Sequence, residues 1–444
     1  MHRYHELRIP GRFEPLVLAG ALAASGSFAS HVVYERDGDW WFAGDTLAEV
    51  VLDRDSLRTT VEGRTSVEPW SGASLAPVSL ALSGAGVARW RAFGWAAFEL
   101  SYVLAGKRDL VGAQTLLHLC VPRTEIRIAV DEVVVRTVDV DRLTDVRDLI
   151  AVPFDLSAAV DATPVDVTAE DGRAAYQGAV SAAVADIRAG QLQKVILSRA
   201  VEVPFNVDLV STYVLGRRSN TPARSFLLDL GGWRAAGFSP ETVAEVGADG
   251  RVSTQPLAGT RARTGAASDA ARRADLVTDP KEVYEHAASV KLACDELAAL
   301  CEPGSVAVAE FMAVKERGSV QHLGSRVTGA LAPGADAFTA LAALFPAITA
   351  SGIPKAPAYD RIAALEDGPR DLYAGAVLMA DHEGGLDAAL VLRAIYQHGG
   401  RTWLRAGAGI VADSTPEREY TETCEKLASV APHVVRAVRE LAEV

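Results

Sequence analysis

The sequence predicts a mixed fold of helices and strands, and two kinds of hydrophobic pattern support this. Short apolar runs separated by turn residues fill the first 150 residues, for example His31–Glu35, Leu47–Leu52 and Ile126–Val138, and such runs are typical of strands. From Tyr176 to Ile187, apolar residues recur at helical spacing until Gly190. The 444 residues could build one large domain with a continuous core, or two or three smaller ones.

The composition excludes several classes of protein. The formal net charge of −13 argues against a general nucleic-acid binder and against a basic membrane-binding surface. The longest apolar stretches are too short to span a bilayer, and Leu16–Ala24 follows acidic rather than basic residues, so we expect a core helix or strand there instead of a signal peptide. The four cysteines are scattered, which favours reduced, buried thiols in a cytoplasmic protein.

The N-terminal part carries no catalytic pattern and is expected to be scaffold. Phe93–Leu104 is apolar on nearly every side and predicts a buried helix or strand. Asp155–Asp171 is rich in Pro, Asp and Thr, which makes it the candidate seam between an N-terminal part, 1–160, and a C-terminal part, 161–444.

The stretch Arg401–Lys426 holds the first candidate site. Its pattern predicts a strand at Thr402–Leu404, a turn through Gly407 and Gly409 whose N–H groups could approach an anion, and then a helix. Ser414 is the predicted N-cap of that helix, in an S-x-x-E capping box. Glu419 and Glu422 follow, three residues apart and so on one face.

A second predicted helix begins with the same sequence pattern. Asp279 is the predicted N-cap and Pro280 the first helical residue, and Glu282 and Glu285 are again three residues apart. Acidic residues are common at helix starts for electrostatic reasons alone, so one such pair is weak evidence. If the two pairs converge, four carboxylates need a cation or protons, and all-oxygen ligands favour Mg²⁺ over zinc.

Other segments present single polar residues that could equally be structural. Lys194 enters a predicted strand, where a lysine is usually a solvated edge charge but could act as a base if buried. Glu241 follows Ser-Pro in a turn after the predicted hairpin Ser225–Phe238. Thr260 offers a hydroxyl beside Gly259, and His322 lies near the start of another predicted strand.

The last candidates lie between Phe345 and Gln397. Phe345–Lys355 predicts a polar turn whose N–H groups could hold an anion, with Thr349 inside it. Tyr373 and Arg393 fall on the two predicted strands of a further hairpin, Leu372–Met379 and Ala388–Gln397. The sequence contains no P-loop, no strand-linked G-x-G-x-x-G and no G-x-S-x-G elbow.

Taken together, four of these segments resemble the chorismate-binding enzyme family. They are PLAGTR (Pro256–Arg261), DPKEVYEHA (Asp279–Ala287), FPAITASGIPK (Phe345–Lys355) and RAGAGIVADSTPEREYTETCEK (Arg405–Lys426). The resemblance implies an α+β fold with one large domain, in which two antiparallel sheets pack face to face with helices outside. It also implies that chorismate binds between the sheets.

Within this family, the residues resemble the salicylate-forming members of siderophore pathways, of the mycobactin or yersiniabactin kind. An enzyme of an antibiotic pathway that uses salicylate would show the same residues. By that resemblance Lys194 is the base that activates water for attack at C2 of chorismate, and Glu241 is the acid that protonates the departing C4 hydroxyl. The product, isochorismate, would then lose pyruvate to give salicylate. Thr260, TASGIPK, the surroundings of His322 and the segment Phe93–Leu104 favour this second step.

The resemblance also assigns binding roles. Glu285 and Glu422 would bind Mg²⁺ directly, with Glu282 and Glu419 nearby or acting through water. The ring carboxylate would be held by the metal, by the backbone around Gly407 and Gly409, and by Lys426. Tyr373 and Arg393 would hold the enolpyruvyl carboxylate. His322 would orient the substrate, which would also contact Gly259, Thr260 and Thr349.

Three other functions stay open from the sequence. The chain could be an isochorismate synthase that releases its product, an anthranilate-type synthase fed by a separate glutaminase, or a silent chorismate-binding protein. Lys194 argues against the second, because it marks the enzymes that add water. The intact set of Lys194, Glu241, Glu285 and Glu422 argues against the third. We expect a monomer, since no coiled-coil pattern is present, and no obligatory glutaminase partner.

Overall fold

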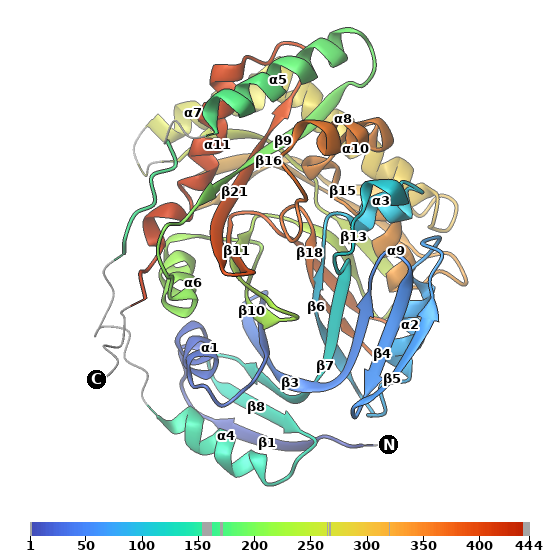
Figure 1. Cartoon of the computed structure of the whole chain (residues 1–444), viewed down its shortest axis with the longest axis vertical. Coiled ribbons are helices and arrows are strands. Elements are labelled where there is room, and N and C mark those ends of the chain that lie inside the picture. The colour runs from blue at the N-terminus through green and yellow to red at the C-terminus, as the bar shows by residue number, and fades with distance from the viewer. Residues whose placement is uncertain are drawn as a thin grey trace.

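The structure is a computed structural model that describes residues 2–152, 162–168, 172–263, 265, 268–318 and 320–437. Its strands pair only antiparallel in the described ranges, and they form two large sheets that share two long strands (Figure 1). The predicted seam, 155–171, lies largely outside the described residues, so the division at 160 stays a prediction. Strands before and after this seam pair directly: β2 (His31–Arg36) pairs with β10 (Arg224–Leu230), and β6 (Arg91–Ala96) pairs with β18 (Ala376–Asp381).

The first sheet forms one wall of the candidate site. In order across the sheet, its strands are β17 (Gly352–Ile353), β9 (Lys194–Glu202), β21 (Arg401–Ile410), β20 (Ala394–His398), β11 (Trp233–Ser239), β10 (Arg224–Leu230), β2 (His31–Arg36), β3 (Asp39–Leu52), β7 (Leu117–Ile128), β8 (Glu132–Thr137) and β1 (His5–Pro10).

The second sheet carries the opposite wall. Its strands run β5 (Arg64–Pro69), β4 (Ser56–Val61), β3, β7, β6 (Arg91–Ala96), β18 (Ala376–Asp381), β19 (Leu386–Leu390), β12 (Thr242–Val246), β13 (Arg251–Thr254) and β16 (Val320–Ala330), and β16 also pairs with β14 (Leu257–Ala262) and β15 (Ala307–Arg317).

Strands β3 and β7 belong to both sheets because each is long enough to turn from one into the other. The first half of β3 pairs with β2 and its second half with β4, and the β3–β7 register shifts between Thr46 and Ala48. Such an irregularity bends a strand. The two sheets then face each other. Trp95 of β6 donates its Nε1 hydrogen to the Leu230 carbonyl at 3.2 Å, and its ring centroid lies 6.4 Å from that of Trp233 on β11.

Alternation along the strands divides the apolar side chains between two cores. Val32, Tyr34 and Leu228 point into the core between the sheets, whereas their neighbours Val33 and Leu227 point to the outer face of the first sheet, under α1 and α6. This is the period-two pattern of a sheet buried on both sides. The predicted α+β fold with two face-to-face sheets and external helices is therefore confirmed.

The helices cover the outer faces and the upper end of the molecule. They are α1 (Pro15–Ala24), α2 (Ala76–Ser83), α3 (Leu100–Leu104), α4 (Arg142–Ala151), α5 (Arg173–Arg188), α6 (Leu209–Ser219), α7 (Ser268–Thr278), α8 (Pro280–Ala298), α9 (Ala337–Leu344), α10 (Lys355–Leu365) and α11 (Pro416–Leu427), with 3₁₀ turns at Arg108–Leu110, Ile348–Ala350 and Ala431–His433. In the part of the chain that is described, none of them combines the length and the apolar character that crossing a membrane requires.

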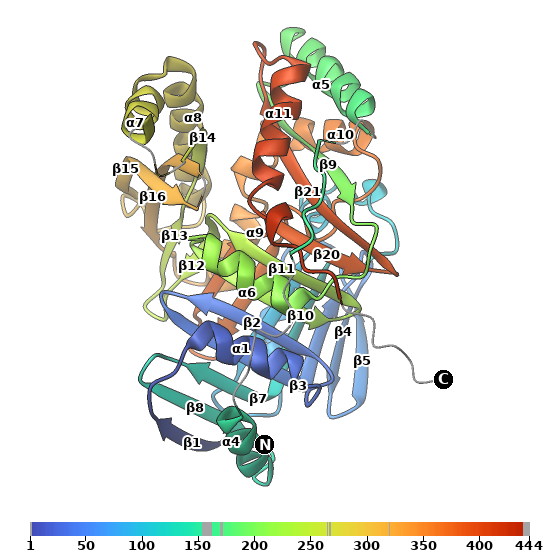
Figure 2. The ribbon, with the colours of Figure 1, turned by 90° about the vertical axis from the view of Figure 1, so that its left-hand side faces the viewer.

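Two groups of elements stand apart at the upper end. On one side α7 and α8 pack on β14 and β16, and on the other α11 packs on β21 and α5 (Figure 2). The two predicted E-x-x-E helices, α8 and α11, thus face one another across the gap between these groups.

Several local predictions hold. The segment 93–104 contains both alternatives, because β6 ends at Ala96 and α3 begins at Leu100. The hairpin of β10 and β11 turns through Gly231 and Gly232, both with positive φ. The cysteines are all free, as predicted, but only Cys120 and Cys301 are buried, and the other two are partly exposed.

Candidate active site

A cavity of about 390 Å³ lies between the two groups of elements at the upper end. Its volume is in the usual range for a small-molecule site. All the site residues predicted above line it: Lys194, Glu241, Gly259, Thr260, Glu282, Glu285, His322, Thr349, Tyr373, Arg393, Gly407, Gly409, Glu419, Glu422 and Lys426. The predicted residues therefore surround one cavity, and their roles there stay predictions. The structure adds how they are paired.

Glu241 lies in the short connection from β11 to β12 and is only 3% exposed. The Thr349 hydroxyl donates to one of its carboxylate oxygens at 2.7 Å, and the Leu257 N–H donates to the other at 2.9 Å. Burial raises the pKa of Glu241 to about 7, although both hydrogen bonds act to lower it. A carboxyl group with this pKa is half-protonated at neutral pH and suits a general acid.

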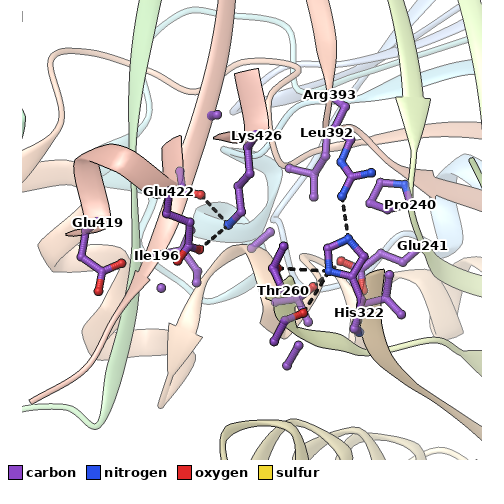
Figure 3. A pocket seen from close by; sticks show the side chains of 18 of the residues that line it. Ile196, Pro240, Glu241, Thr260, His322, Leu392, Arg393, Glu419, Glu422 and Lys426 are labelled. Atoms are coloured by element: carbon purple, nitrogen blue, oxygen red, sulfur yellow. Dashed lines mark hydrogen bonds and ion pairs between the residues drawn. The ribbon is translucent and has the colours of Figure 1, made fainter. Parts of the chain in front are cut away.

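His322 and Arg393 form a second buried unit on the same side of the cavity (Figure 3). A guanidinium has no acceptor, so His322 Nε2, 2.6 Å from Arg393 Nη2, must accept its hydrogen bond. We therefore assign the ring hydrogen to Nδ1, which lies 3.0 Å from the Gly259 carbonyl and 3.1 Å from the Thr260 hydroxyl. Burial, reinforced by Arg393, holds the pKa of His322 well below its ordinary value, so this imidazole is neutral.

Arg393 keeps its charge without a carboxylate partner. Burial and the neighbouring Arg317 lower its pKa to about 10, which leaves the guanidinium protonated at neutral pH. It donates to the Arg317 carbonyl at 3.2 Å, and no carboxylate within the described residues lies at ion-pair distance from it. Its backbone has φ of 50°, in the left-handed region that a bulky residue rarely adopts. This conformation sets a cation into the wall of the cavity.

Lys194 begins β9, as predicted, and is only 4% exposed. Its Nζ lies 2.5 Å from Glu285 Oε1 on α8. A Cβ at Gly409 would stand 3.1 Å from Lys194 Cε, so a glycine there leaves room for the lysine stem. The solvated-edge alternative for Lys194 is wrong, because β21 and β17 pair with β9 on either side of it.

Lys426 and Glu422 form a comparable pair one turn apart on α11. Lys426 Nζ lies 2.8 Å from Glu422 Oε1 and also donates to the Gly407 carbonyl at 2.8 Å. Burial disfavours both charges, yet each group stabilises the other, so the pKa of Glu422 is lowered and that of Lys426 is raised. A Cβ at Gly407 would stand 2.8 Å from the Tyr373 hydroxyl, so this glycine makes room for Tyr373.

Glu282 is held by Arg261, which the sequence analysis left without a role. Arg261 contacts Glu282 at 2.8 Å, Asp279 at 2.8 Å and Asp275 at 2.6 Å, and so ties β14 to α7 and to the start of α8. The signal was present in the PLAGTR motif, but three partners on other elements could not be inferred from it. Asp279 caps α8 as predicted, accepting from the N–H groups of Lys281 and Glu282.

Glu419 differs from the other three carboxylates. It is 2% exposed, and among the described residues no cation lies within ion-pair distance of it. Burial, and next the charge of Glu422, raise its pKa, whereas a hydrogen bond from Ser414 acts in the opposite direction. The cavity therefore contains a buried carboxylate that lacks a counter-charge.

The four carboxylates line one cavity but do not form a preassembled metal cage. No three His, Cys, Asp or Glu side chains of the described ranges are grouped closely enough to hold an ion. Their donor chemistry still fits Mg²⁺, because all four offer oxygen ligands and Glu419 has no cation. Glu285 and Glu422 are each paired with a lysine ammonium instead.

Three local predictions are wrong. Gly407 and Gly409 do not form a turn, because β21 continues to Ile410 and pairs with β9 throughout. The N–H groups of Ile196 and Ser198 point away from β21, to Ser351 and Glu366, so the register turns the peptide groups of both glycines away from β9 as well. Their approach to a carboxylate stays a prediction.

The other two concern helix and strand ends. The N-cap of α11 is Thr415 rather than Ser414, and the Thr415 side chain makes no capping hydrogen bond. The Ser414 hydroxyl instead accepts a hydrogen bond from the Val411 N–H. Tyr373 and Arg393 lie outside the strands: Tyr373 precedes β18, and Arg393 lies in the bend between β19 and β20. Their side chains nevertheless line the cavity.

Comparisons with known proteins show which family the chain resembles over most of its length. The sequence pattern of the family described as chorismate binding enzyme matches residues 30–432. A salicylate synthase from Mycolicibacterium paratuberculosis is 46% identical over 432 residues, which cover 96% of this chain and 95% of that protein. Anthranilate synthase component 1 from Streptomyces coelicolor is 39% identical over 284 residues, but these cover only 62% of this chain and 55% of that protein.

Solved structures share the fold. Anthranilate synthase component I from Streptococcus pneumoniae superposes with a TM-score of 0.76 at 24% identity, covering 91% of this chain and 93% of that one. The menaquinone-specific isochorismate synthase from Escherichia coli gives 0.74 at 21% identity, covering 98% and 95%.

Proposed function

This chain belongs to the chorismate-binding enzyme family, and on that premise we propose that it is a magnesium-dependent salicylate synthase. It converts chorismate to isochorismate, and then isochorismate to salicylate and pyruvate. The observation that carries this choice is the similarity to a salicylate synthase over nearly the whole of both chains. The similarity to an anthranilate synthase is shorter and covers about half of that protein.

In the first step water adds to C2 and the C4 hydroxyl departs, with the ring double bonds shifting between them. Lys194 in its neutral amine form takes a proton from the attacking water and becomes an ammonium group, and protonated Glu241 gives its proton to the departing hydroxyl, which leaves as water. One water enters and one leaves, so isochorismate has the same formula as chorismate. The pKa of Glu241, about 7, supports its role as the acid.

In the second step the hydrogen on C2 moves to the methylene carbon of the enolpyruvyl group, and the bond from C3 to the ether oxygen breaks. The ring becomes aromatic, and the two products together contain every atom of isochorismate. The residues only need to hold the side chain over the ring, which lowers the barrier by fixing the reacting atoms close together. The neutral His322, held by Arg393 and Gly259, is suited to orient the substrate in both steps.

Two carboxylates of the substrate need positive partners. Arg393 is a partly buried guanidinium with no carboxylate at ion-pair distance among the described residues, and it can bind the enolpyruvyl carboxylate with two parallel hydrogen bonds. Tyr373 lines the same cavity. Glu285 and Glu422 would hold Mg²⁺, with Glu419 and Glu282 around them. When bound, the ion supplies a strong positive charge for the ring carboxylate.

The finer assignments are part of the same proposal. We place the enzyme in the cytoplasm, as a monomer that needs no glutaminase subunit, with its salicylate used in siderophore assembly. The resemblance of its motifs to the salicylate-forming members supports that use.

The proposal is tested by incubating the purified protein with chorismate and Mg²⁺ in the absence of ammonia and separating the products by chromatography. We expect salicylate and pyruvate in equal amounts. Isochorismate alone would make the chain an isochorismate synthase, the second candidate. An absolute need for ammonia would place it with the anthranilate type and remove Lys194 from its role as base.

A further inference from the structure

The carboxylates assigned to the metal already have cations. Glu285 is paired with Lys194 at 2.5 Å, and Glu422 is paired with Lys426 at 2.8 Å. Both ammonium groups lie inside the cavity wall, where an unpaired carboxylate would be costly. At Glu285 and Glu422 the chain without metal therefore supplies its own counter-charges, whereas Glu419 has none among the described residues. A divalent cation can reach Glu285 and Glu422 only by replacing these partners.

The ion pairs of Glu282, Glu285 and Glu422 differ in how many other partners their cation has. Arg261 keeps Asp275 and Asp279 even without Glu282, and Lys426 keeps the Gly407 carbonyl even without Glu422. The Nζ of Lys194 has Glu285 as its sole hydrogen-bond partner among the described residues. Lys194 is thus the cation whose position depends most on the carboxylate it neutralises.

We propose that the Lys194 ammonium is an exchangeable counter-ion of Glu285, so that a divalent cation binding to Glu285 displaces Lys194 into the cavity. This inference rests on the proposed function, because it adds a link between two parts of the same site. Metal binding then both completes the carboxylate site and releases the side chain that must contact the attacking water. The substrate would meet an available Lys194 only when the metal is bound.

A second buried pair provides a matched control. Lys355 Nζ lies 2.6 Å from Glu296 Oε1, and Glu296 is on α8, as Glu285 is. The side chains of Glu285 and Glu296 are equally exposed, at 18% each. Glu296 does not line the cavity, so removing Lys355 leaves an unpaired α8 carboxylate that a metal at the site cannot neutralise.

The test is metal binding without substrate. The full-length protein and the variants Lys194→Met and Lys355→Met are titrated with MgCl₂ by calorimetry, and their thermal unfolding is followed with and without MgCl₂. Both variants should unfold at lower temperature without metal, because each leaves a partly buried carboxylate unpaired. Only Lys194→Met should be rescued by Mg²⁺. It should bind the ion about tenfold more tightly than the parent protein, since a competing charge at the site is gone.

Several outcomes would overturn the proposal. Lys194→Met could bind Mg²⁺ no more tightly than the parent, or Mg²⁺ could rescue Lys355→Met equally well. If Lys194→Met does not fold, Lys194→Gln keeps a hydrogen-bond donor without the charge and should show the same tighter binding, and unchanged binding would again contradict the exchange. None of these readouts requires turnover, so they remain decisive if the products reveal an isochorismate synthase instead.

Discussion

The two ends of the cavity differ in which charge lacks a partner on the protein. At the end formed by α8 and α11, Glu419 is a buried carboxylate with no cation in ion-pair reach among the described residues. At the other end, Arg393 is a partly buried guanidinium with no carboxylate at ion-pair distance among the described residues. One end therefore requires a cation and the other an anion.

This difference indicates what the cavity binds. A metal ion at the acidic end and an anionic substrate reaching to Arg393 would complete both ends at once. A substrate with two carboxylates, one on the metal and one on the guanidinium, is held across the whole cavity. In the proposed reaction the carbons that change lie between Lys194 and Glu241, and both side chains line the cavity.

The largest effect is expected at Lys194. Replacing Lys194 with Ala should lower the rate of water addition by about 10³-fold, the usual contribution of a general base. Pyruvate release from supplied isochorismate should be nearly unchanged, because that step needs no base from the protein. Product chromatography with each substrate separates the two steps, and continued consumption of chorismate would disprove the assignment.

The substitution Glu422→Gln tests the acidic end of the cavity. We expect Mg²⁺ binding to weaken by about 100-fold, because one charge at contact distance is lost and Lys426 loses its partner. Calorimetric titration with MgCl₂ measures this directly. The matched change Glu425→Gln lies on the same helix, where Glu425 pairs with the exposed Arg418 and does not line the cavity, and it should leave the affinity unchanged. An unaltered titration for Glu422→Gln would remove this residue from the metal site.

The basic end is broken more mildly by Arg393→Lys. The charge stays, but the two parallel hydrogen bonds to a carboxylate are lost, so KM for chorismate should rise about tenfold. Mg²⁺ affinity without substrate should not change, since Arg393 is at the opposite end. Steady-state kinetics and the metal titration together test this, and a change in metal affinity alone would contradict the separation of the two ends.

The smallest effect concerns Thr349, which donates to Glu241 and thereby lowers its pKa. In Thr349→Val the pKa of Glu241 should rise above about 7, because the bond that favours the carboxylate is gone. The general acid must be protonated, so the fall in the rate of water addition at alkaline pH should move to higher pH by less than about one unit. A pH–rate profile that shifts to lower pH would contradict this role.

The same carboxyl group affects stability. Its pKa in the folded chain lies above its ordinary value, so the folded state binds this proton more tightly than the unfolded state does. That contribution is complete below the ordinary carboxyl pKa and is lost as the pH rises through about 7. Glu241→Gln should remove this part of the pH dependence of unfolding.

Local sequence patterns were sufficient to predict those elements whose structure depends on residues close in sequence. The start of α8 at Asp279-Pro280, the turn through Gly231 and Gly232, and the entry of β9 at Lys194 were all predicted from a few adjacent residues. Each depends on backbone preferences or on capping within one turn. The resemblance to one family also predicted residues that the structure brings around one cavity, although their roles remain untested.

Long-range pairing decided what could not be predicted. Gly407 and Gly409 have the composition of a turn, yet pairing with β9 some 200 residues earlier extends them into a strand. The partners of Lys194, Arg261 and Arg393 are likewise on distant elements. These contacts determine which charges are balanced and which remain for ligands, and no local pattern contains that information.

The most direct test of the whole account is the reaction in ¹⁸O-labelled water with chorismate and Mg²⁺, with the mass of the salicylate recorded. Water that adds at C2 becomes the phenolic hydroxyl, so we predict salicylate with one ¹⁸O atom and unlabelled pyruvate measured before exchange. Unlabelled salicylate, or a product that forms only when ammonia is supplied, would contradict the account.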